Sequence, residues 1–438
     1  MFRYAINDLY KWKESKYRKP LIIKGARQVG KTWLMKHFGK EAYQNTVYIN
    51  FDNNKTIEGL FNHGFDIPNI INGLEIYSGK KITANKTLLI FDEVQESPKA
   101  LSSLKYFYEE SPEIHIICAG SLLGISLHNG TSFPVGKVDF LNLYPMSFPE
   151  FLIANNQERY VDLIDKGDFE MVTTFKDTYI NFLRLYYYVG GMPEVVLRFI
   201  ENNDYLEVQK NQRHILDSYE LDFSKHAPNA LVPRIKMVYE SIPSQLAKEN
   251  KKFVYGTLRE GARAKDYEMA IMWLNDCNLT HKIHRINKPN LPITSYKDLK
   301  AFKLFISDVG LLSCLSGLNS KTLLKRNKLF TEFKGSLTEQ YVLQQLVSMK
   351  NINTYYYTNE RNTAEIDFVI DNGEKLIPIE VKAETNLMAK SLKAYRDKFS
   401  PTMSIRTSMA DYKEEEGLIN LPLYAFWSLE KAINLSNN

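Results

Sequence analysis

The sequence has little cysteine, no long apolar run and almost no net charge. Only three of its 438 residues are cysteine, and because these lie far apart in apolar surroundings we expect reduced core residues rather than a disulfide or a metal site: Cys118, Cys277 and Cys314. No apolar run approaches the roughly eighteen residues that a membrane span needs, and the N-terminus lacks a charged-then-apolar leader. We therefore expect no membrane partner and a cytoplasmic location.

The charge balance excludes few binding partners. The chain has 56 basic and 51 acidic residues, a net charge of +5, so it does not demand a nucleic-acid partner, although local patches could supply one. Its content of 44% hydrophobic and 24% charged residues is typical of a globular protein. Because a chain of 438 residues exceeds what one core usually holds, we expect about three domains.

A glycine-rich loop separates a short apolar segment from a helix-like one. The loop consists of Gly25, Ala26, Arg27, Gln28, Val29, Gly30, Lys31 and Thr32. Residues 21–23 before it are apolar and residues 33–38 continue as a helix, which is the context that a phosphate-binding loop needs. The glycines let backbone N–H groups face a phosphate, and the helix N-terminus adds partial positive charge. We expect Lys31 to reach the β- and γ-phosphates of ATP and Thr32 to hold Mg²⁺.

An acidic pair follows a second apolar segment, the strand predicted at 87–93. Four apolar residues followed by Asp92 and Glu93 match the acidic partner of a phosphate-binding loop. In that role Asp92 orients Mg²⁺ through its water shell, and Glu93 polarises the attacking water. Carboxylates also occur at strand ends simply because those ends reach solvent. The functional interpretation of the pair therefore depends on the glycine-rich loop that precedes it.

The first 150 residues predict an α/β fold with a parallel sheet. Strand-like segments lie at 21–23, 46–52, 87–93, 114–119 and 138–143. Strands that alternate with helices favour a parallel sheet that binds ligands at its carboxyl end. Ser121, just after the fourth segment, either senses the γ-phosphate of the nucleotide or caps the next helix.

Farther along, the order of elements suits a winged-helix module. Helices expected at 240–250, 255–261 and 265–278 precede strand-like segments at 282–286 and 301–307. A cluster of basic residues around this region forms either a solvated face or a nucleic-acid contact: Lys248, Lys251, Lys252, Arg259, Arg263 and Lys265.

The last hundred or so residues bring carboxylates near one predicted hairpin. Glu339 falls on the apolar face of a predicted helix, where a charge is costly unless it is paired or bound to a metal. Asp367 lies on the first strand of the hairpin, and Glu380 and Lys382 share one face of the second. Such a group could hold a second Mg²⁺ while Lys382 helps to activate water for phosphodiester attack, or it could be a salt-bridged sheet face.

These motifs resemble those of prokaryotic AAA-type ATPases that carry a C-terminal domain of unknown function. The resemblance rests on the loop, the acidic pair and three further segments. These are Gly120-Ser121, Leu143-Tyr144-Pro145 with Phe148, Glu150 and Phe151, and Gly190-Gly191-Met192-Pro193. It implies an ATPase core at 1–155, a helical lid at 156–228, a winged-helix module at 229–318 and a restriction-endonuclease-like α/β domain at 319–438.

The resemblance also implies residue roles. Pro193 would lie in a lid turn near the base of the nucleotide, and Asp367, Glu380 and Lys382 would take the nuclease-fold positions. Relatives commonly have Gly-Arg before the fifth strand, whereas this sequence has Gly136-Lys137. Because lysine keeps the charge but loses the two-pronged donor of arginine, we name no arginine finger. Hydrolysis slower by about 10³ to 10⁵ would suit a switch better than a motor.

Three functions remain open from the sequence. The first is an Mg²⁺-dependent ATPase that acts as a nucleotide-driven switch coupled to the C-terminal nuclease-like domain. The second is an ATP-gated, Mg²⁺-dependent nuclease that acts on DNA or RNA, bound through the winged helix and the C-terminal domain. The third is a nucleotide-dependent switch that recruits a protein partner and cuts nothing.

Overall fold

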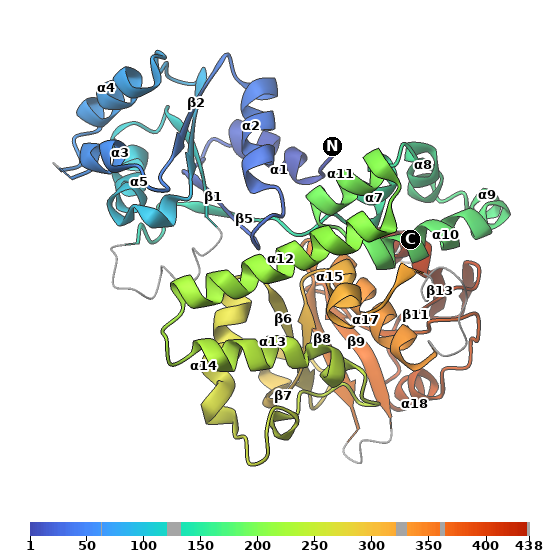
Figure 1. Ribbon diagram of the computed structural model, residues 1–438. Coiled ribbons are helices and arrows are strands. Elements are labelled where there is room, and N and C mark those ends of the chain that lie inside the picture. The colour runs from blue at the N-terminus through green and yellow to red at the C-terminus, as the bar shows by residue number, and fades with distance from the viewer. Residues whose placement is uncertain (63, 121–132, 321–330, 360–363, 436–438) are drawn as a thin grey trace. The chain divides into compact units, whose positions relative to one another are not determined.

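A computed structural model describes residues 1–62, 64–120, 133–320, 331–359 and 364–435. It divides the chain into two compact units (Figure 1). The first comprises residues 1–144 with 276–279, and the second comprises residues 145–275 with 280–438. Ser121 lies outside the described residues. Among those described, no helix is both long and apolar enough to cross a membrane.

The first unit is built on a five-stranded sheet in which every strand pairs in parallel, as the sequence predicted. Its strand order is β2-β3-β4-β1-β5. The strands are β1 (Leu21–Lys24), β2 (Asn45–Asn50), β3 (Thr87–Asp92), β4 (His115–Ala119) and β5 (Asp139–Asn142). All residues of β3 are buried, as expected for a central strand covered on both faces. The order places β1 and β3 on either side of β4, with their carboxyl ends at the same edge.

Helices surround this sheet (Figure 1). They are α1 (Ala5–Glu14), α2 (Lys31–Ala42), α3 (Lys55–Leu60), α4 (Ile67–Ser78) and α5 (Pro98–Glu110). Two begin with a side-chain cap followed by proline in the first turn: Asp66 accepts a hydrogen bond from Asn69 in α4, and Ser97 accepts one from Ala100 in α5. Cys118 is buried in the core that they form.

The second unit joins helices to a larger mixed sheet. The helices are α7 (Phe148–Ala154), α8 (Glu158–Lys166), α9 (Phe169–Thr174), α10 (Lys176–Val189), α11 (Pro193–Asn202), α12 (Tyr205–His226), α13 (Val232–Leu246), α14 (Ala264–Asp276), α15 (Val309–Leu315), α17 (Thr331–Ser348), α18 (Lys390–Phe399) and α19 (Leu429–Leu435). The helix expected at 255–261 is only a 3₁₀ turn at Tyr255–Thr257. Gly256 and Gly261 explain the difference, because glycine disfavours a helix interior.

The sheet of the second unit has eight strands in the order β12-β13-β11-β10-β9-β8-β6-β7. The strands are β6 (Thr280–Ile286), β7 (Lys297–Ile306), β8 (Asn353–Thr358), β9 (Glu365–Asp371), β10 (Leu376–Val381), β11 (Ser404–Ser408), β12 (Lys413–Glu415) and β13 (Leu418–Pro422). The strands expected in a separate winged-helix module, β6 and β7, thus belong to the same sheet as the C-terminal strands. The parallel pairing of β6 with β8 connects β6 and β7 to the C-terminal strands, and no local sequence pattern predicts it.

Candidate functional site

The glycine-rich loop follows β1, and α2 begins at Lys31, as the sequence predicted. Gly30 precedes the helix in the left-handed conformation, with φ 92° and ψ 23°, which glycine adopts without strain. A Cβ atom on Gly25 would lie 2.2 Å from the carbonyl oxygen of Leu143, so this position has no room for a side chain. The side chains of Arg27 and Gln28 are exposed and that of Val29 is buried.

Lys31 reaches back across the loop. Its side chain is only 8% exposed, and its Nζ donates hydrogen bonds to the carbonyl oxygens of Gly25 at 2.9 Å and Ala26 at 2.8 Å. These contacts hold the ammonium group over the turn whose N–H groups would cradle a phosphate. The charge thus lies where a phosphate chain at this helix N-terminus would need it.

Thr32 and Asp92 meet at the carboxyl edge of the sheet. The Thr32 hydroxyl donates a 2.7 Å hydrogen bond to Asp92 Oδ2, and the Tyr48 hydroxyl donates to the same oxygen at 2.9 Å. Asp92 Oδ1 accepts a hydrogen bond from the backbone of Glu93 at 3.1 Å. Burial and the Asp92 carboxylate raise the pKa of Tyr48, so its hydroxyl remains a donor at neutral pH. Asp92 is therefore held in one orientation from three sides.

Glu93 has an unusual backbone for a non-glycine residue, with φ 52° and ψ 41°. Left-handed conformations of this kind cost free energy and cluster at functional sites. Gln95 Nε2 donates a 2.6 Å hydrogen bond to Glu93 Oε2 and so orients the carboxylate. In the acidic pair predicted from sequence, Asp92 is thus the last residue of β3, whereas the left-handed backbone of Glu93 turns the chain away from the strand.

Two residues that the sequence analysis missed support this site. Tyr48 is on β2, whose parallel pairing with β3 brings it beside Asp92. Arg3 is 5% exposed and donates to the carbonyl oxygens of Val29 at 2.8 Å and Tyr144 at 2.6 Å, so it anchors the loop to the segment after β5. Tyr48 could have been suspected from the predicted neighbouring strands, but nothing in the sequence pattern indicated Arg3.

The oxygen atoms at this edge fit Mg²⁺. Mg²⁺ prefers oxygen ligands and usually keeps several waters, with one or two protein groups and the phosphates of a nucleotide. The Thr32 hydroxyl and the Asp92 carboxylate supply such oxygens side by side. Lys137, at the position where the resemblance implies an arginine, forms an ion pair with Glu109 at 2.8 Å.

In the second unit, the Gly190-Gly191-Met192-Pro193 segment forms a close-packed junction. Pro193 is the first residue of α11, as a helix boundary requires. The N–H of Gly191 donates to Asp308 Oδ2 at 2.6 Å, and a Cβ atom on Gly191 would lie 2.1 Å from the carbonyl oxygen of Met146. The glycines are explained by this close backbone approach. The expected contact of Pro193 with a nucleotide base stays a prediction.

The C-terminal residues singled out from the sequence form one largely buried charged cluster with residues from other elements. This carboxylate–lysine cluster consists of Glu339, Glu365, Asp367, Glu380, Lys251, Lys303 and Lys382. Lys382 Nζ lies 2.7 Å from Glu380 Oε1, and the N–H of Val381 donates to Asp367 Oδ2 at 2.8 Å. The predicted residues therefore do converge, although on a site with more cations than expected.

Two further lysines pair with Glu339, which the sequence analysis assigned to a metal. Lys251 Nζ hydrogen-bonds to Glu339 Oε1, and the fully buried Lys303 Nζ lies 3.6 Å from Glu339 Oε2 and 2.5 Å from Glu365 Oε1. Lys251, expected in a basic cluster around a winged helix, instead points into this site. The reason is Glu339, whose buried carboxylate needs a counter-charge.

The ionisation of the cluster follows from these contacts. Burial opposes the charged form of Glu339, but Lys251 and Lys303 outweigh it and hold the pKa of Glu339 below its usual value. Burial and the carboxylates of Glu339 and Glu380 raise the pKa of Asp367 well above its usual range. Burial also raises the pKa values of Glu365 and Glu380, which Lys303 and Lys382 respectively counteract. The lysines thus supply positive charge to each of these carboxylates without any metal.

This arrangement does not fit a divalent ion. Glu339 Oε2 and Glu380 Oε2 are buried and accept no hydrogen bond from the described residues, so oxygens are present. However, no group of three or more His, Cys, Asp or Glu side chains in the described part of the chain is placed to hold a metal. Both carboxylates are already paired with ammonium groups, Glu339 with Lys251 and Lys303 and Glu380 with Lys382. We therefore derive no catalytic step through a metal at this cluster.

Comparison with known proteins agrees with the site in the first unit. Residues 17–152 match a family model described as "AAA domain". Residues 180–322 and 334–426 match models described as "Domain of unknown function", DUF8612 and DUF4143 respectively. No curated protein matches the chain.

Three solved structures are similar at low identity. The Walker-type ATPase paby2304 of Pyrococcus abyssi is 14% identical, with a TM-score of 0.45 over 72% of this chain and 96% of that chain. The ORC1 protein of Aeropyrum pernix in complex with DNA is 12% identical, with a TM-score of 0.27 over 72% and 93%. AMPPCP-bound DnaA from Aquifex aeolicus is 16% identical, with a TM-score of 0.26 over 61% and 75%. The match of residues 17–152 to an AAA domain agrees with the loop geometry of the first unit.

Proposed function

We propose that this protein is an Mg²⁺-dependent ATPase whose nucleotide cycle acts as a switch coupled to its C-terminal nuclease-like domain. The observation that carries the proposal is the 2.7 Å hydrogen bond between the Thr32 hydroxyl and the Asp92 carboxylate, next to a lysine folded over the loop. This combination supplies a positive cradle for phosphates and an oxygen pair for Mg²⁺ at one edge of the sheet.

Each residue of the site has a proposed task. Backbone N–H groups of the loop and the N-terminus of α2 bind the phosphates, and Lys31 moves from the carbonyls of Gly25 and Ala26 onto the β- and γ-phosphates. The Thr32 hydroxyl and the Asp92 carboxylate would hold Mg²⁺. Glu93, oriented by Gln95, positions the attacking water. Mg²⁺ itself supplies neutralisation of the charge on the phosphates.

ATP binding and turnover measured on two variants would test this proposal. Lys31→Ala should lose nucleotide binding because the cation over the loop is gone. Glu93→Gln should still bind ATP but hydrolyse it at least about 10²-fold more slowly, because the water is no longer polarised. Lys40→Ala, an exposed lysine on the same helix, is the matched control and should behave as wild type. Undiminished hydrolysis in both site variants would refute the proposal.

A C-terminal nuclease has weaker support. Glu380 and Lys382 lie side by side at the end of β10 beside Asp367, which favours phosphodiester chemistry. The pairing of Lys251 with Glu339 disfavours a metal-dependent nuclease, because the ammonium group neutralises the carboxylate that a metal would need. We expect no cleavage of labelled DNA or RNA with Mg²⁺ or Mn²⁺, with or without ATP. Cleavage that Asp367→Ala abolishes would instead establish the ATP-gated nuclease, and its absence leaves recruitment of a protein partner as the alternative output.

A further inference from the structure

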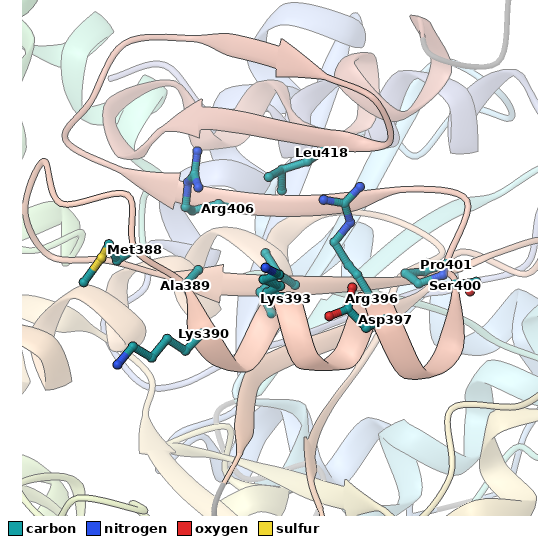
Figure 2. A pocket seen from close by; sticks show the side chains of 11 residues that line it. Met388, Ala389, Lys390, Lys393, Arg396, Asp397, Ser400, Pro401, Arg406 and Leu418 are labelled. Atoms are coloured by element: carbon teal, nitrogen blue, oxygen red, sulfur yellow. The ribbon is translucent and has the colours of Figure 1, made fainter.

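A pocket of about 630 Å³ lies in the second unit, between α18 and the strands β11 and β13. Figure 2 shows its lining: side chains of α18 and the residues flanking it, with Arg406 from β11 and Leu418 from β13. None of these residues belongs to the nucleotide site or to the carboxylate–lysine cluster. The pocket is therefore a separate feature with no role in the function proposed above.

The lining is strongly basic. It contains Lys390, Lys393, Arg396 and Arg406 but only one acid, Asp397. Within the described part of the chain none of these four cations lies within ion-pair distance of a carboxylate. Glu415 acts electrostatically on Arg406, but it is exposed and already paired with Lys413 at 2.5 Å. The pocket thus has an excess of positive charge without a fixed counter-ion.

Arg406 is the most informative of the four. It is only 7% exposed, and its Nε and Nη1 donate to neutral acceptors, the amide oxygen of Asn420 at 3.2 Å and the carbonyl oxygen of Leu387 at 2.8 Å. A buried charge without an opposite charge is costly. The two hydrogen bonds fix the guanidinium plane and leave Nη2 for a ligand. Preorganised arginines of this kind recognise phosphate groups through two parallel hydrogen bonds.

The other three cations form a row. Lys390, Lys393 and Arg396 follow one another at intervals of three residues along α18, so their Cα atoms rise about 4.5 Å per step. A row of cations suits a ligand with repeated negative charges better than a single anion. Apolar surface accompanies the row, from the exposed Met388 and from Leu418. A strand that alternates charged phosphates with less polar sugars and bases has this character.

We propose that this pocket binds the phosphodiester backbone of single-stranded nucleic acid. The apolar lining beside the cations suits a strand with unpaired bases, which it can contact, rather than a duplex with its bases stacked inside. Arg406 on β11 pairs in register with Glu380 on the neighbouring strand β10. Nucleic acid bound at Arg406 would therefore lie next to the carboxylate–lysine cluster. The proposal goes beyond the ATPase and does not depend on it.

Fluorescence anisotropy with the full chain tests the proposal. The probe is a labelled DNA or RNA strand of about 16 nucleotides, within the range that single-strand sites cover, in EDTA so that nothing is cut. Lys393→Gln combined with Arg396→Gln should weaken binding at least tenfold. It should also reduce the slope of log K against log salt concentration by about 1.4, since each phosphate contact on a single strand contributes about 0.7. Lys398→Gln, on the same helix but outside the pocket, is the matched control.

Three results would overturn the proposal. They are no binding by wild type, an unchanged affinity and salt slope in the double variant, and displacement of the strand by an equal concentration of a mononucleotide, which would indicate a small-molecule site. A further variant separates this inference from the ATPase. Lys31→Ala should bind the strand as wild type does, so failure of the ATPase proposal leaves this test intact.

Discussion

The hydroxyl of Thr32 donates a 2.7 Å hydrogen bond to the carboxylate of Asp92, which is 60 residues farther along the chain. The contact joins the first turn of α2 to the end of β3, and β4 separates β3 from β1 in the sheet. Both side chains are thus held by elements whose positions the sheet determines. An oxygen pair preorganised in this way needs little rearrangement to receive Mg²⁺ with ATP.

Replacing the Thr32 hydroxyl tests this relationship. Thr32→Val keeps the shape of the side chain but removes one metal ligand and the hydrogen bond to Asp92. We expect a loss in ATP turnover of about 10² to 10³, the usual effect of removing one electrostatic group from an active site. Thr32→Ser retains the hydroxyl and should recover most of the activity. A titration of turnover against Mg²⁺ should show a higher half-saturating concentration in Thr32→Val only.

The close approach at Gly191 predicts a stability effect. In Gly191→Ala the new Cβ would lie 2.1 Å from the carbonyl oxygen of Met146, so backbone must move and the 2.6 Å hydrogen bond to Asp308 is strained. We expect a loss in the free energy of unfolding of about 1–3 kcal/mol. Gly335→Ala, in α17 with open space around its Cβ, should be neutral or stabilising by up to about 1 kcal/mol. Equal melting temperatures of the two variants would contradict this reading.

His115 predicts a loss of stability in acid. Burial and the charges of Arg18 and Lys13 lower the pKa of His115 from 6.5 to about 4. Between these values the unfolded chain binds a proton that the folded chain does not, so stability falls as the pH drops from 7 toward 4 and levels off below. The full shift corresponds to about 3 kcal/mol, and because solvent partly screens the ring we expect about 1–2 kcal/mol.

Comparison with His115→Gln isolates this contribution. The variant should lose less stability than wild type when denaturant unfolding is repeated at pH 7 and pH 4.5. His281 and His284, whose pKa values burial also lowers to about 4, are present in both proteins and cancel in the difference. The same pH dependence in both proteins would mean that His115 is not the group responsible.

The residues that local sequence pattern could predict are those that act within one strand–loop–helix unit. The loop from Gly25 to Thr32 and the pair Asp92 and Glu93 were identified because their spacing and flanking apolar runs are local signals. Tyr48 and Arg3 were missed because their roles depend on strand order and on a contact across the fold.

In the second unit too, contacts join residues far apart in the chain, which local sequence pattern does not predict. The convergence of Asp367 and Glu380 followed from hairpin periodicity, but the lysines that pair with the cluster come from a loop after α13 and from β7. Lys251 is 88 residues from Glu339 in the chain. The pairing of β6 with β8, which unites the strands of the expected module with the C-terminal sheet, is likewise a long-range event that periodicity does not encode.

In the carboxylate–lysine cluster, we expect substitutions of Asp367 and Lys303 to change the free energy of unfolding by different amounts. Burial and the neighbouring carboxylates raise the pKa of Asp367 and so favour its neutral form. Asp367→Asn introduces a neutral group of the same shape, whose oxygen can still accept from Val381. We expect its free energy of unfolding to stay within about 1 kcal/mol of wild type. Lys303→Met fills a similar volume but leaves the buried Glu339 and the partly buried Glu365 without this lysine, and should cost about 3–5 kcal/mol. Denaturant unfolding at pH 7 distinguishes the two. A large loss in Asp367→Asn would show instead that this carboxylate is ionised, and that the lysines do not by themselves complete the charge balance.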